Sequence, residues 1–297
     1  MILIKGLPVF AKRVSKLLNR YDIKAQVFGS RFIDKVCFLF NIPFSQSVIS
    51  VSGNHKSFFL PVYCKVFRKK YIVFWCGSDV DRAVVDYKND KFTLKNKIAL
   101  KCSKHYCEVP WIKEKLESIG IESEILINGN VIFQEEEFSI SPFPEKFKVF
   151  TYLGKGKEEF YGLGWLKKLA KDFFDVEFVV IGTDNYSLFC DAKNITLLGW
   201  VDDVDRVVKD NVIYLRLTQR DSIGNLVLFS AINGRYVIRT KYIDNISITV
   251  KSYDELYHAI NEKIQNFNFS SLPLNDKCAE LKKYREKNVI SNILEVL

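Results

Sequence analysis

Side chains suited to bind a phosphorylated ligand lie where a strand-like run, Val212–Leu217, leads through a loop into a helical pattern, Asn225–Asn233. The run delivers Arg216, Thr218 and Arg220 toward the loop before the helix, and Gly224 stands just ahead of the helix start. The N–H groups at a helix N-terminus attract phosphate, a glycine lets the backbone approach a ligand closely, and an arginine neutralises phosphate charge. Strand–loop–helix connections are common, so this segment by itself predicts only an anion site.

Glycine-rich turns follow two other strand-like runs of the second half. Phe147–Leu153 leads into Gly154-Lys-Gly-Lys157, and Val176–Ile181 leads into Gly182. Because the carboxyl ends of parallel strands meet at one edge of a sheet, we expect both turns to lie beside the arginine-bearing loop.

In the first half, two loops place polar side chains at the expected ends of strands. Ser52-Gly-Asn-His55 follows the run Ser47–Val51 and precedes a helical pattern, so His55 is either an acid–base or acceptor-binding group or a helix cap. Trp75-Cys-Gly-Ser-Asp79 follows the next run, and Asp79 fits a functional carboxylate and a helix cap equally well. We take His55 as the candidate catalytic residue of this half and leave both interpretations of Asp79 open.

The seven cysteines form no pattern typical of disulfides or of a zinc site. They are scattered and odd in number, which indicates a reducing compartment. Cys102, His105 and Cys107 have ligand-like residue types, but a structural zinc site needs four ligands and no second pair accompanies this cluster. We expect buried thiols here and no metal, with a metal site as the alternative.

The order of predicted elements places these residues in α/β domains. Strand-like and helical patterns alternate along the chain, and the strands are blocky and β-branched, which is typical of parallel sheets covered on both faces. In the first half we expect strands at Met1–Ile4, Lys24–Phe28, Ser47–Val51, Tyr71–Trp75, His105–Val109 and Glu122–Ile127, and helices at Val9–Arg20, Arg31–Phe40, Lys56–Phe67 and Pro110–Ile119. In the second half we further expect strands at Ile195–Leu198 and Tyr236–Arg239, and helices at Phe160–Phe173, Val204–Lys209, Tyr253–Asn266 and Asp276–Leu297.

An acidic, proline-containing stretch, Gln134–Glu145, interrupts this alternation and is the predicted interdomain linker. We therefore expect two doubly wound, Rossmann-like domains, residues 1–140 and 146–297. Ligands should bind in a cleft where the carboxyl ends of the two sheets face each other. The last helix is a candidate to pack back on the first domain.

The second half resembles the retaining glycosyltransferases of the GT-B fold, in the "glycosyl transferases group 1" (family 4) class. In that family's donor-site segment an acid and a glycine precede a helix, and a small-residue, glycine and apolar-strand pattern follows; Tyr214–Ile238 looks like this segment. The other similar turns are Ile181-Gly182, Leu198-Gly-Trp-Val201, Tyr152-Leu-Gly-Lys-Gly-Lys157 and, in the first half, Trp75-Cys-Gly-Ser-Asp79.

Carried over residue by residue, the resemblance implies a site for a UDP- or GDP-linked sugar in the second domain. It implies that Asp221 acts near the transferred sugar and that Lys155 contacts the donor phosphates. The remaining implied donor-binding residues are Gly154, Lys157, Gly182, Arg216, Thr218, Ser222, Gly224, Asn225 and Leu226. Two positions depart from the family: its second acid falls on Phe229, and its lysine after the glycine-rich turn falls on Tyr161, with Lys157 as the candidate substitute.

The resemblance also implies an activity. It predicts transfer of a hexose from the donor in the second domain to an unidentified acceptor (lipid-linked, glycan or protein) on the first domain. The transfer would retain the sugar's configuration and use neither metal nor other cofactor. The alternative, motivated by Phe229, is a catalytically degenerate relative that binds a nucleotide, a glycan or a partner protein.

Basic residues are concentrated near the N-terminus, with 13 Lys+Arg and 2 Asp+Glu in residues 1–70 of a chain whose net charge is +9. Arg68-Lys-Lys70 is a candidate contact with acidic membrane headgroups, and a solvated lysine-rich surface is the alternative. Nucleic acid is not expected, because no recognised binding motif accompanies the charge. The apolar N-terminal stretch is too short for a secretory signal, and no run approaches the ~20 residues of a membrane span. We expect a cytoplasmic protein, with the membrane surface as a candidate location.

Overall fold

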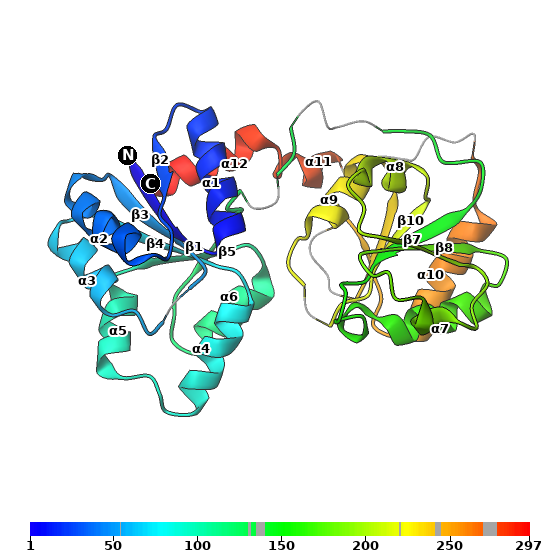
Figure 1. The fold of residues 1–297 in the computed structure, drawn as a ribbon, viewed down its shortest axis with the longest axis horizontal. Helices are drawn as coiled ribbons and strands as arrows, with labels where there is room; N and C mark the ends of the chain where they lie inside the picture. Colours follow the sequence, from blue (N-terminus) through cyan, green and yellow to red (C-terminus); the bar gives the residue numbers. More distant parts are fainter. Residues whose placement is uncertain (54, 130–131, 135–139, 220, 241–244, 270–277) are drawn as a thin grey trace. The chain divides into compact units, whose positions relative to one another are not determined.

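The computed structural model describes residues 1–297 apart from 54, 130–131, 135–139, 220, 241–244 and 270–277. The chain forms two compact units, each described by itself below: unit 1 comprises Met1–Ile132 with Tyr284–Leu297, and unit 2 comprises Phe133–Lys283 (Figure 1). The sequence placed the division between residues 140 and 146, whereas the packing divides the chain after Ile132. The last helix belongs to unit 1, the domain on which the sequence analysis made it a candidate to pack.

Unit 1 is built on a six-stranded sheet in which every pairing is parallel. Its strands are β1 (Ile2–Gly6), β2 (Ala25–Val27), β3 (Ser47–Val51), β4 (Lys70–Trp75), β5 (Lys104–Cys107) and β6 (Glu124–Ile125), in the order β2-β1-β3-β4-β5-β6. Its helices are α1 (Pro8–Arg20), α2 (Phe32–Asn41), the 3₁₀ turn η1 (Ile42–Phe44), α3 (Phe59–Val66), α4 (Ser78–Lys88), α5 (Leu94–Lys101), α6 (Pro110–Glu117) and α12 (Glu286–Val296).

The local sequence explains most of these elements. Proline at the first position starts α1, where its fixed φ suits the helix and its missing N–H is not needed. β3 is buried along its whole length because helices cover both faces of a parallel sheet. The periodicity did not predict α4 and α5; α5 starts with a capping box in which Thr93 and Asn96 exchange hydrogen bonds with each other's backbone.

Unit 2 repeats the architecture with a second parallel sheet. Its strands are β7 (Lys148–Tyr152), β8 (Glu177–Ile181), β9 (Ile195–Gly199), β10 (Ile213–Arg216), β11 (Tyr236–Arg239) and β12 (Ile248–Thr249), in the order β12-β11-β10-β7-β8-β9. Its helices are α7 (Leu163–Asp172), α8 (Val204–Lys209), α9 (Asn225–Ile232), α10 (Tyr253–Gln265) and α11 (Cys278–Lys282), with 3₁₀ turns η3 (Glu159–Tyr161) and η4 (Tyr186–Phe189).

Two helices are shorter than the sequence predicted. The predicted helix Phe160–Phe173 is interrupted by Gly162, whose φ of +88° belongs to the left-handed region and separates η3 from α7. The predicted C-terminal helix is broken into α11 and α12, which belong to different units. An ion pair between Arg20 and Glu286, 2.9 Å long, fixes the start of α12 to the end of α1.

The predicted class, α/β with two doubly wound parallel sheets, is confirmed. In unit 1 the chain runs from β1 to β2 on one side and then returns to β3 on the other; in unit 2 it does the same at β7 and β10. Each sheet therefore has one switch point, between β1 and β3 and between β7 and β10. Doubly wound sheets bind ligands at the carboxyl ends of the strands beside such a point. The cleft expected between the two domains stays a prediction.

Candidate functional site

The loops after β7 and β10 lie side by side at the carboxyl edge of the unit 2 sheet, because these two strands are paired. Tyr161 joins them. Gly154, after β7, packs so closely against this ring that a Cβ at Gly154 would lie 2.8 Å from it. Arg216, the last residue of β10, places its guanidinium 5.3 Å from the ring centroid. The ring of Tyr161 therefore contacts both loops.

Asp221 lies between two arginines. Its carboxylate accepts two hydrogen bonds from Arg216, at 3.0 Å from Nε and 2.9 Å from the terminal nitrogen, and a third from Arg239 at 2.8 Å. The Asp221 side chain is 4% exposed, that of Arg239 1% and that of Arg216 17%. A bidentate pair fixes the plane of the guanidinium. Arg216, Asp221 and Arg239, which we call the arginine triad, carry two positive charges and one negative charge. The arginine triad therefore presents net positive charge beside the switch point.

The predicted lysines of the opening turn lie at the surface of unit 2. Lys155 pairs with Asp184 Oδ1 at 3.0 Å, and both side chains are exposed. The hydrogen bond from Lys155 lowers the pKa of the Asp184 carboxyl. Lys157 is exposed and has no ion-pair partner within the part of the chain that the structure describes. An exposed ion pair is weak, so an incoming phosphate can displace Asp184 from Lys155.

Gly182 brings the turn after β8 against the turn after β7. Its φ is +99°, and a Cβ there would lie 2.5 Å from the carbonyl oxygen of Leu153. The hydroxyl of Thr183 donates to Glu158 Oε1 at 2.8 Å, which ties this turn to the segment before η3. A residue with a side chain at position 182 would force these two turns apart.

The start of α9 has features that favour an anion. Gly224 is its N-cap residue, with φ +72°, so no side chain caps the helix, and its first turn contains no acidic residue. Of the predicted donor-binding residues here, Ser222 and Leu226 are half-buried and Asn225 is exposed. Phe229 lies one turn further along the same helix, also half-buried. The N-terminus of α9 therefore keeps its partial positive charge next to the arginine triad.

A pocket of about 450 Å³ lies beside these loops in unit 2. Its lining includes Thr218, Thr240, Trp165 and Lys251. The Thr218 hydroxyl is buried and has no hydrogen-bond partner among the residues that the structure describes. A buried hydroxyl without a partner is costly, so this group is available to a polar ligand.

His55 lies in unit 1 and is almost fully buried. Its Nε2 donates to Asp86 Oδ2 at 2.8 Å, and its ring stacks on Phe92 with centroids 5.1 Å apart. Hydrogen bonds from Lys56 and His55 lower the pKa of the Asp86 carboxyl. The predicted catalytic histidine thus borders a pocket of this unit, with its orientation fixed by a carboxylate and an aromatic ring.

Asp79 is a structural tie. Its carboxylate accepts hydrogen bonds from the backbone N–H groups of Cys76, Gly77 and Val80 at the start of α4, and from Gly53 in the loop after β3. A Cβ at Gly53 would lie 2.1 Å from the ring of Trp75, so the two loops are in direct contact. Of the two interpretations left open by the sequence, these bonds favour helix capping.

The Cys102–His105–Cys107 cluster has no nitrogen ready to bind a metal. His105 Nδ1 accepts from the indole N–H of Trp75 at 3.2 Å, and Nε2 donates to the Leu100 carbonyl at 3.0 Å. Burial lowers the pKa of His105, so the neutral form is favoured. Within the described part of the chain, no group of three or more His, Cys, Asp or Glu residues is arranged to hold a metal ion, and six cysteines are free thiols.

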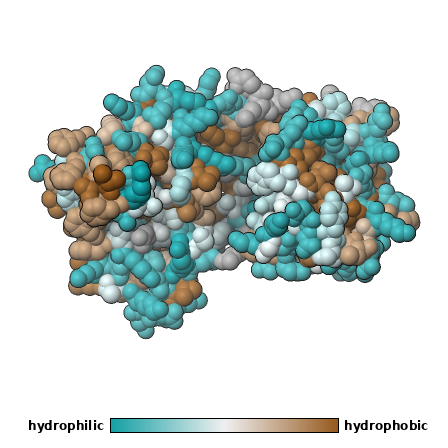
Figure 2. Space-filling model, viewed as in Figure 1, coloured by the Kyte–Doolittle hydropathy of each residue, from teal (hydrophilic) through white to brown (hydrophobic). Residues whose placement is uncertain are grey.

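Sequence reasoning missed an exposed apolar surface on unit 1. The apolar spacing predicted helices at Arg31–Phe40 and Lys56–Phe67 but gave no sign of this surface, and in α2 only Phe38 is buried. The exposed residues of this surface, which we call the aromatic face, are Phe32, Ile33 and Phe40 of α2, Phe44 of η1, and Phe59 and Val66 of α3. Figure 2 shows apolar side chains gathered over α2 and α3, at the left of the view. Monomeric proteins rarely leave such a patch uncovered without a use for it.

Comparison with known proteins gives a match in structure only. No family model matches the sequence, and no curated protein is detectably similar to it. Anabaena HepE, solved with UDP-glucose, is 11% identical, with a TM-score of 0.66 over 99% of this chain and 98% of its own. The lipopolysaccharide outer core galactosyltransferase WaaB is 14% identical (TM-score 0.63, 99% and 98% covered).

A glycosyltransferase from Rickettsia africae is 12% identical, with a TM-score of 0.62 over 99% of this chain and 95% of its own. Identities this low show a shared fold and nothing finer. The fold is that of the GT-B glycosyltransferases, with two Rossmann-like domains, as the resemblance implied.

Proposed function

We propose that the chain is a glycosyltransferase that moves a hexose from a nucleotide-diphosphate sugar to an acceptor. The observation that carries the proposal is the arginine triad. In a GT-B fold, Arg216 is held rigidly by Asp221 at the switch point of the second sheet, next to the uncapped start of α9. Three neighbouring structures belong to Anabaena HepE with UDP-glucose, with UDP and glucose, and with UDP, which supports a UDP-sugar as the donor.

The proposed chemistry is departure of a nucleoside diphosphate. The bond between the sugar and the diphosphate breaks while negative charge develops on the leaving oxygen, and fixed positive groups lower the free energy of that state. Arg216, Lys155 and the N–H groups at the start of α9 supply this stabilisation. We propose that the acceptor hydroxyl attacks from the face that the diphosphate leaves, which retains configuration, and that its proton passes to the departing diphosphate. We also propose that no metal takes part.

The geometry suggests a different role for Asp221 from the one implied by the resemblance. Its carboxylate is occupied by three hydrogen bonds from two arginines and is almost fully buried. We propose that Asp221 positions Arg216 instead of contacting the sugar. The contribution of Gly154 and Gly182 is to bring the turns after β7 and β8 close enough for backbone contact with the nucleotide.

We propose that unit 1 binds the acceptor, in the pocket that His55 borders. Asp86 holds His55 through Nε2, which fixes the orientation of the ring at the edge of this pocket. This arrangement suits a histidine that assists the acceptor hydroxyl. The acceptor itself is a lipid-linked sugar, a glycan or a protein.

Measuring turnover of a panel of nucleotide sugars tests the proposal. The full chain is incubated with UDP- and GDP-hexoses and acceptor mixtures, and proton and phosphorus NMR follow release of the diphosphate and the anomeric configuration of the product. We expect release with one donor, retention, and a loss of about a hundredfold or more in kcat/KM for Arg216→Met. Arg206→Met, which changes an exposed arginine on α8, is the matched control and should leave turnover unchanged.

A second candidate function is binding without catalysis, as in a degenerate relative. Phe229 favours it, because the family's second acid is absent at this position of α9. Saturable binding of a nucleotide sugar, with no diphosphate released for any acceptor, would support this alternative and contradict the transferase.

We also propose that unit 1 docks on an acidic membrane through the aromatic face. Basic side chains surround it: Arg31 at the start of α2 is 82% exposed, and Lys65 and Arg68 lie exposed at the end of α3. Phenylalanines flanked by lysine and arginine bind interfaces by apolar insertion and by attraction to anionic lipids. None of the described helices is long and apolar enough to cross a membrane. The free thiols suit the cytoplasmic side.

Vesicle sedimentation tests the docking. The double variant Phe32→Ser, Phe44→Ser should bind vesicles containing phosphatidylglycerol roughly tenfold more weakly than the parent, because each ring contributes apolar burial. Phe174→Ser changes a phenylalanine of unit 2 that is 74% exposed and serves as the control. Equal loss in both variants, or equal binding of the parent to vesicles of neutral lipid, would contradict the proposal.

A further inference from the structure

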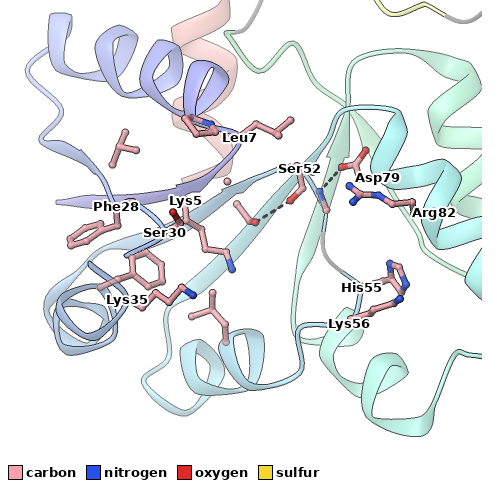
Figure 3. A pocket seen from close by; sticks show the side chains of 18 of the residues that line it. Lys5, Leu7, Phe28, Ser30, Lys35, Ser52, His55, Lys56, Asp79 and Arg82 are labelled. Atoms are coloured by element: carbon pink, nitrogen blue, oxygen red, sulfur yellow. Dashed lines mark hydrogen bonds between the residues drawn. The ribbon is translucent and has the colours of Figure 1, made fainter. Parts of the chain in front are cut away.

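A pocket of about 1030 Å³ opens at the carboxyl ends of β1, β2 and β3 in unit 1 (Figure 3). It lies beside the switch point between β1 and β3, where a doubly wound sheet is expected to bind a ligand. Residues from α1, α2, α3 and α4 complete its wall. The pocket is therefore large enough for a ligand of several tens of atoms and is formed by elements of one unit alone.

Three lysines line this pocket from three different elements: Lys5 from β1, Lys12 from α1 and Lys35 from α2. None of the three has a hydrogen-bond or ion-pair partner among the residues that the structure describes. In Figure 3, Lys5 and Lys35 point toward the same part of the pocket, one from the sheet and one from the helix. Positive charge from separate elements thus converges on one space without an internal counter-charge.

The acids of the same wall do not neutralise these lysines, because each is already bound elsewhere. Asp79 accepts backbone N–H groups of two loops. Asp81 pairs with Lys115 at 2.7 Å, outside the pocket lining. Asp86 is held by His55 and Lys56. The three carboxylates of this wall therefore already have partners other than Lys5, Lys12 and Lys35.

Lys5 is the most informative of the three. It is half-buried near the end of β1, and burial lowers the pKa of its ammonium group. A charged group held away from water without a partner destabilises the folded chain, and an anionic ligand removes that cost. The start of α1 adds to the field, since Leu7 gives it no side-chain cap and its first turn has no acid.

The wall beside Lys35 is apolar and aromatic. Phe28 and Phe38 pack edge to face with ring centroids 5.3 Å apart, and Leu39 and Leu60 extend the same surface. A ligand that fills the pocket must therefore carry an anionic group and, next to it, a carbon skeleton that rests on these side chains. Sugar phosphates and polyprenyl phosphates both have this composition.

We propose that this pocket binds the phosphate group of a phosphorylated acceptor, with Lys5, Lys12 and Lys35 as its ligands. That the bound molecule is an acceptor rests on the function proposed above, whereas the binding itself does not. The phosphate comes either from a sugar phosphate in solution or from a lipid headgroup, and the same three lysines would bind both.

Titration calorimetry without any nucleotide sugar tests the binding separately from transfer. The probes are a hexose 1-phosphate, geranyl diphosphate and inorganic pyrophosphate, each added to the full chain. We expect single substitutions Lys5→Met, Lys12→Met and Lys35→Met to weaken the best probe about tenfold or more, because each removes a charge-assisted hydrogen bond. Lys16→Met, on the same helix as Lys12 but outside this pocket, is the matched control and should bind as the parent does.

Thermal unfolding of Lys5→Met separates a binding role from a structural one. Because its pKa is lowered on folding, the charge of Lys5 destabilises unit 1 at neutral pH, so the variant should unfold at a higher temperature than the parent while binding less well. Tighter binding of geranyl diphosphate would identify a lipid-linked phosphate, and tighter binding of the hexose phosphate a soluble one. No binding of any probe, or equal affinities in all four variants, would overturn the proposal whatever the outcome of the transfer assay.

Discussion

Replacing Asp221 with alanine should destabilise unit 2, and the structure gives the size of the effect. The carboxylate accepts hydrogen bonds at 2.8, 2.9 and 3.0 Å from two arginines whose side chains are 1% and 17% exposed. Its removal leaves one buried and one partly buried guanidinium group without this counter-charge. Breaking a buried ion pair from one side costs about 3–5 kcal/mol, a large fraction of a typical total of about 5–15 kcal/mol.

Chemical unfolding in urea, followed by circular dichroism, measures this loss. The two units are separate compact bodies, so each transition is fitted by itself. Asp184→Ala is the control, because Asp184 is also paired with a basic residue but is exposed, and its removal should leave the free energy of unfolding unchanged. Equal free energies of unfolding for Asp221→Ala and the parent would show that the Asp221 carboxylate does not stabilise unit 2. If the destabilisation is found, loss of activity in Asp221→Ala would not identify a catalytic acid.

Two further predictions concern pH and backbone geometry. Burial raises the pKa of the Glu108 carboxyl, which follows β5 in unit 1, to about 7. Unit 1 should therefore lose up to about 3 kcal/mol of stability as pH rises from about 4.5 to about 7. Unfolding titrations of Glu108→Gln should lack this pH dependence. Gly182→Ala places a Cβ 2.5 Å from the Leu153 carbonyl oxygen and should lower the melting temperature, whereas Gly164→Ala, in α7 with open space around it, should raise stability by about 0.5–1 kcal/mol. A pH dependence unchanged by the glutamine, or equal melting of the two alanine variants, would contradict them.

The alternation of strand-like and helical patterns in the sequence predicted most of the fold. β3 and β11 have the predicted bounds because a blocky, β-branched run between polar turns has few other ways to bury both faces. α4 and α5 were not predicted, since α4 follows a glycine with φ +120° and α5 has little apolar periodicity to detect. The assignment of α12 to unit 1 depends on packing with α1, which no local pattern encodes.

The candidate site was predictable in part. Arg216 at the end of β10 and Asp221 in the loop after it stand five residues apart, so one sequence pattern includes both. Arg239 lies at the end of β11 and reaches Asp221 only because β11 pairs with β10 in register, Arg216 opposite Arg239. The converging lysines of unit 1 and the exposed aromatic face of α2 and α3 likewise depend on how helices are laid on the sheet. Knowing the sheet order first would have revealed the arginine pair; it would not have revealed the exposed phenylalanines.

Binding of UDP and GDP to the full chain, measured by calorimetry, tests the central claim that unit 2 holds a nucleotide diphosphate at the arginine triad. The decisive comparison is with Arg216→Met, which should fold because Arg239 still compensates Asp221. We expect one of the two nucleotides to bind the parent, and Arg216→Met to bind it about tenfold or more weakly. The affinity of Arg206→Met should equal that of the parent. Failure of both nucleotides to bind, or equal affinity in the parent and Arg216→Met, would contradict it.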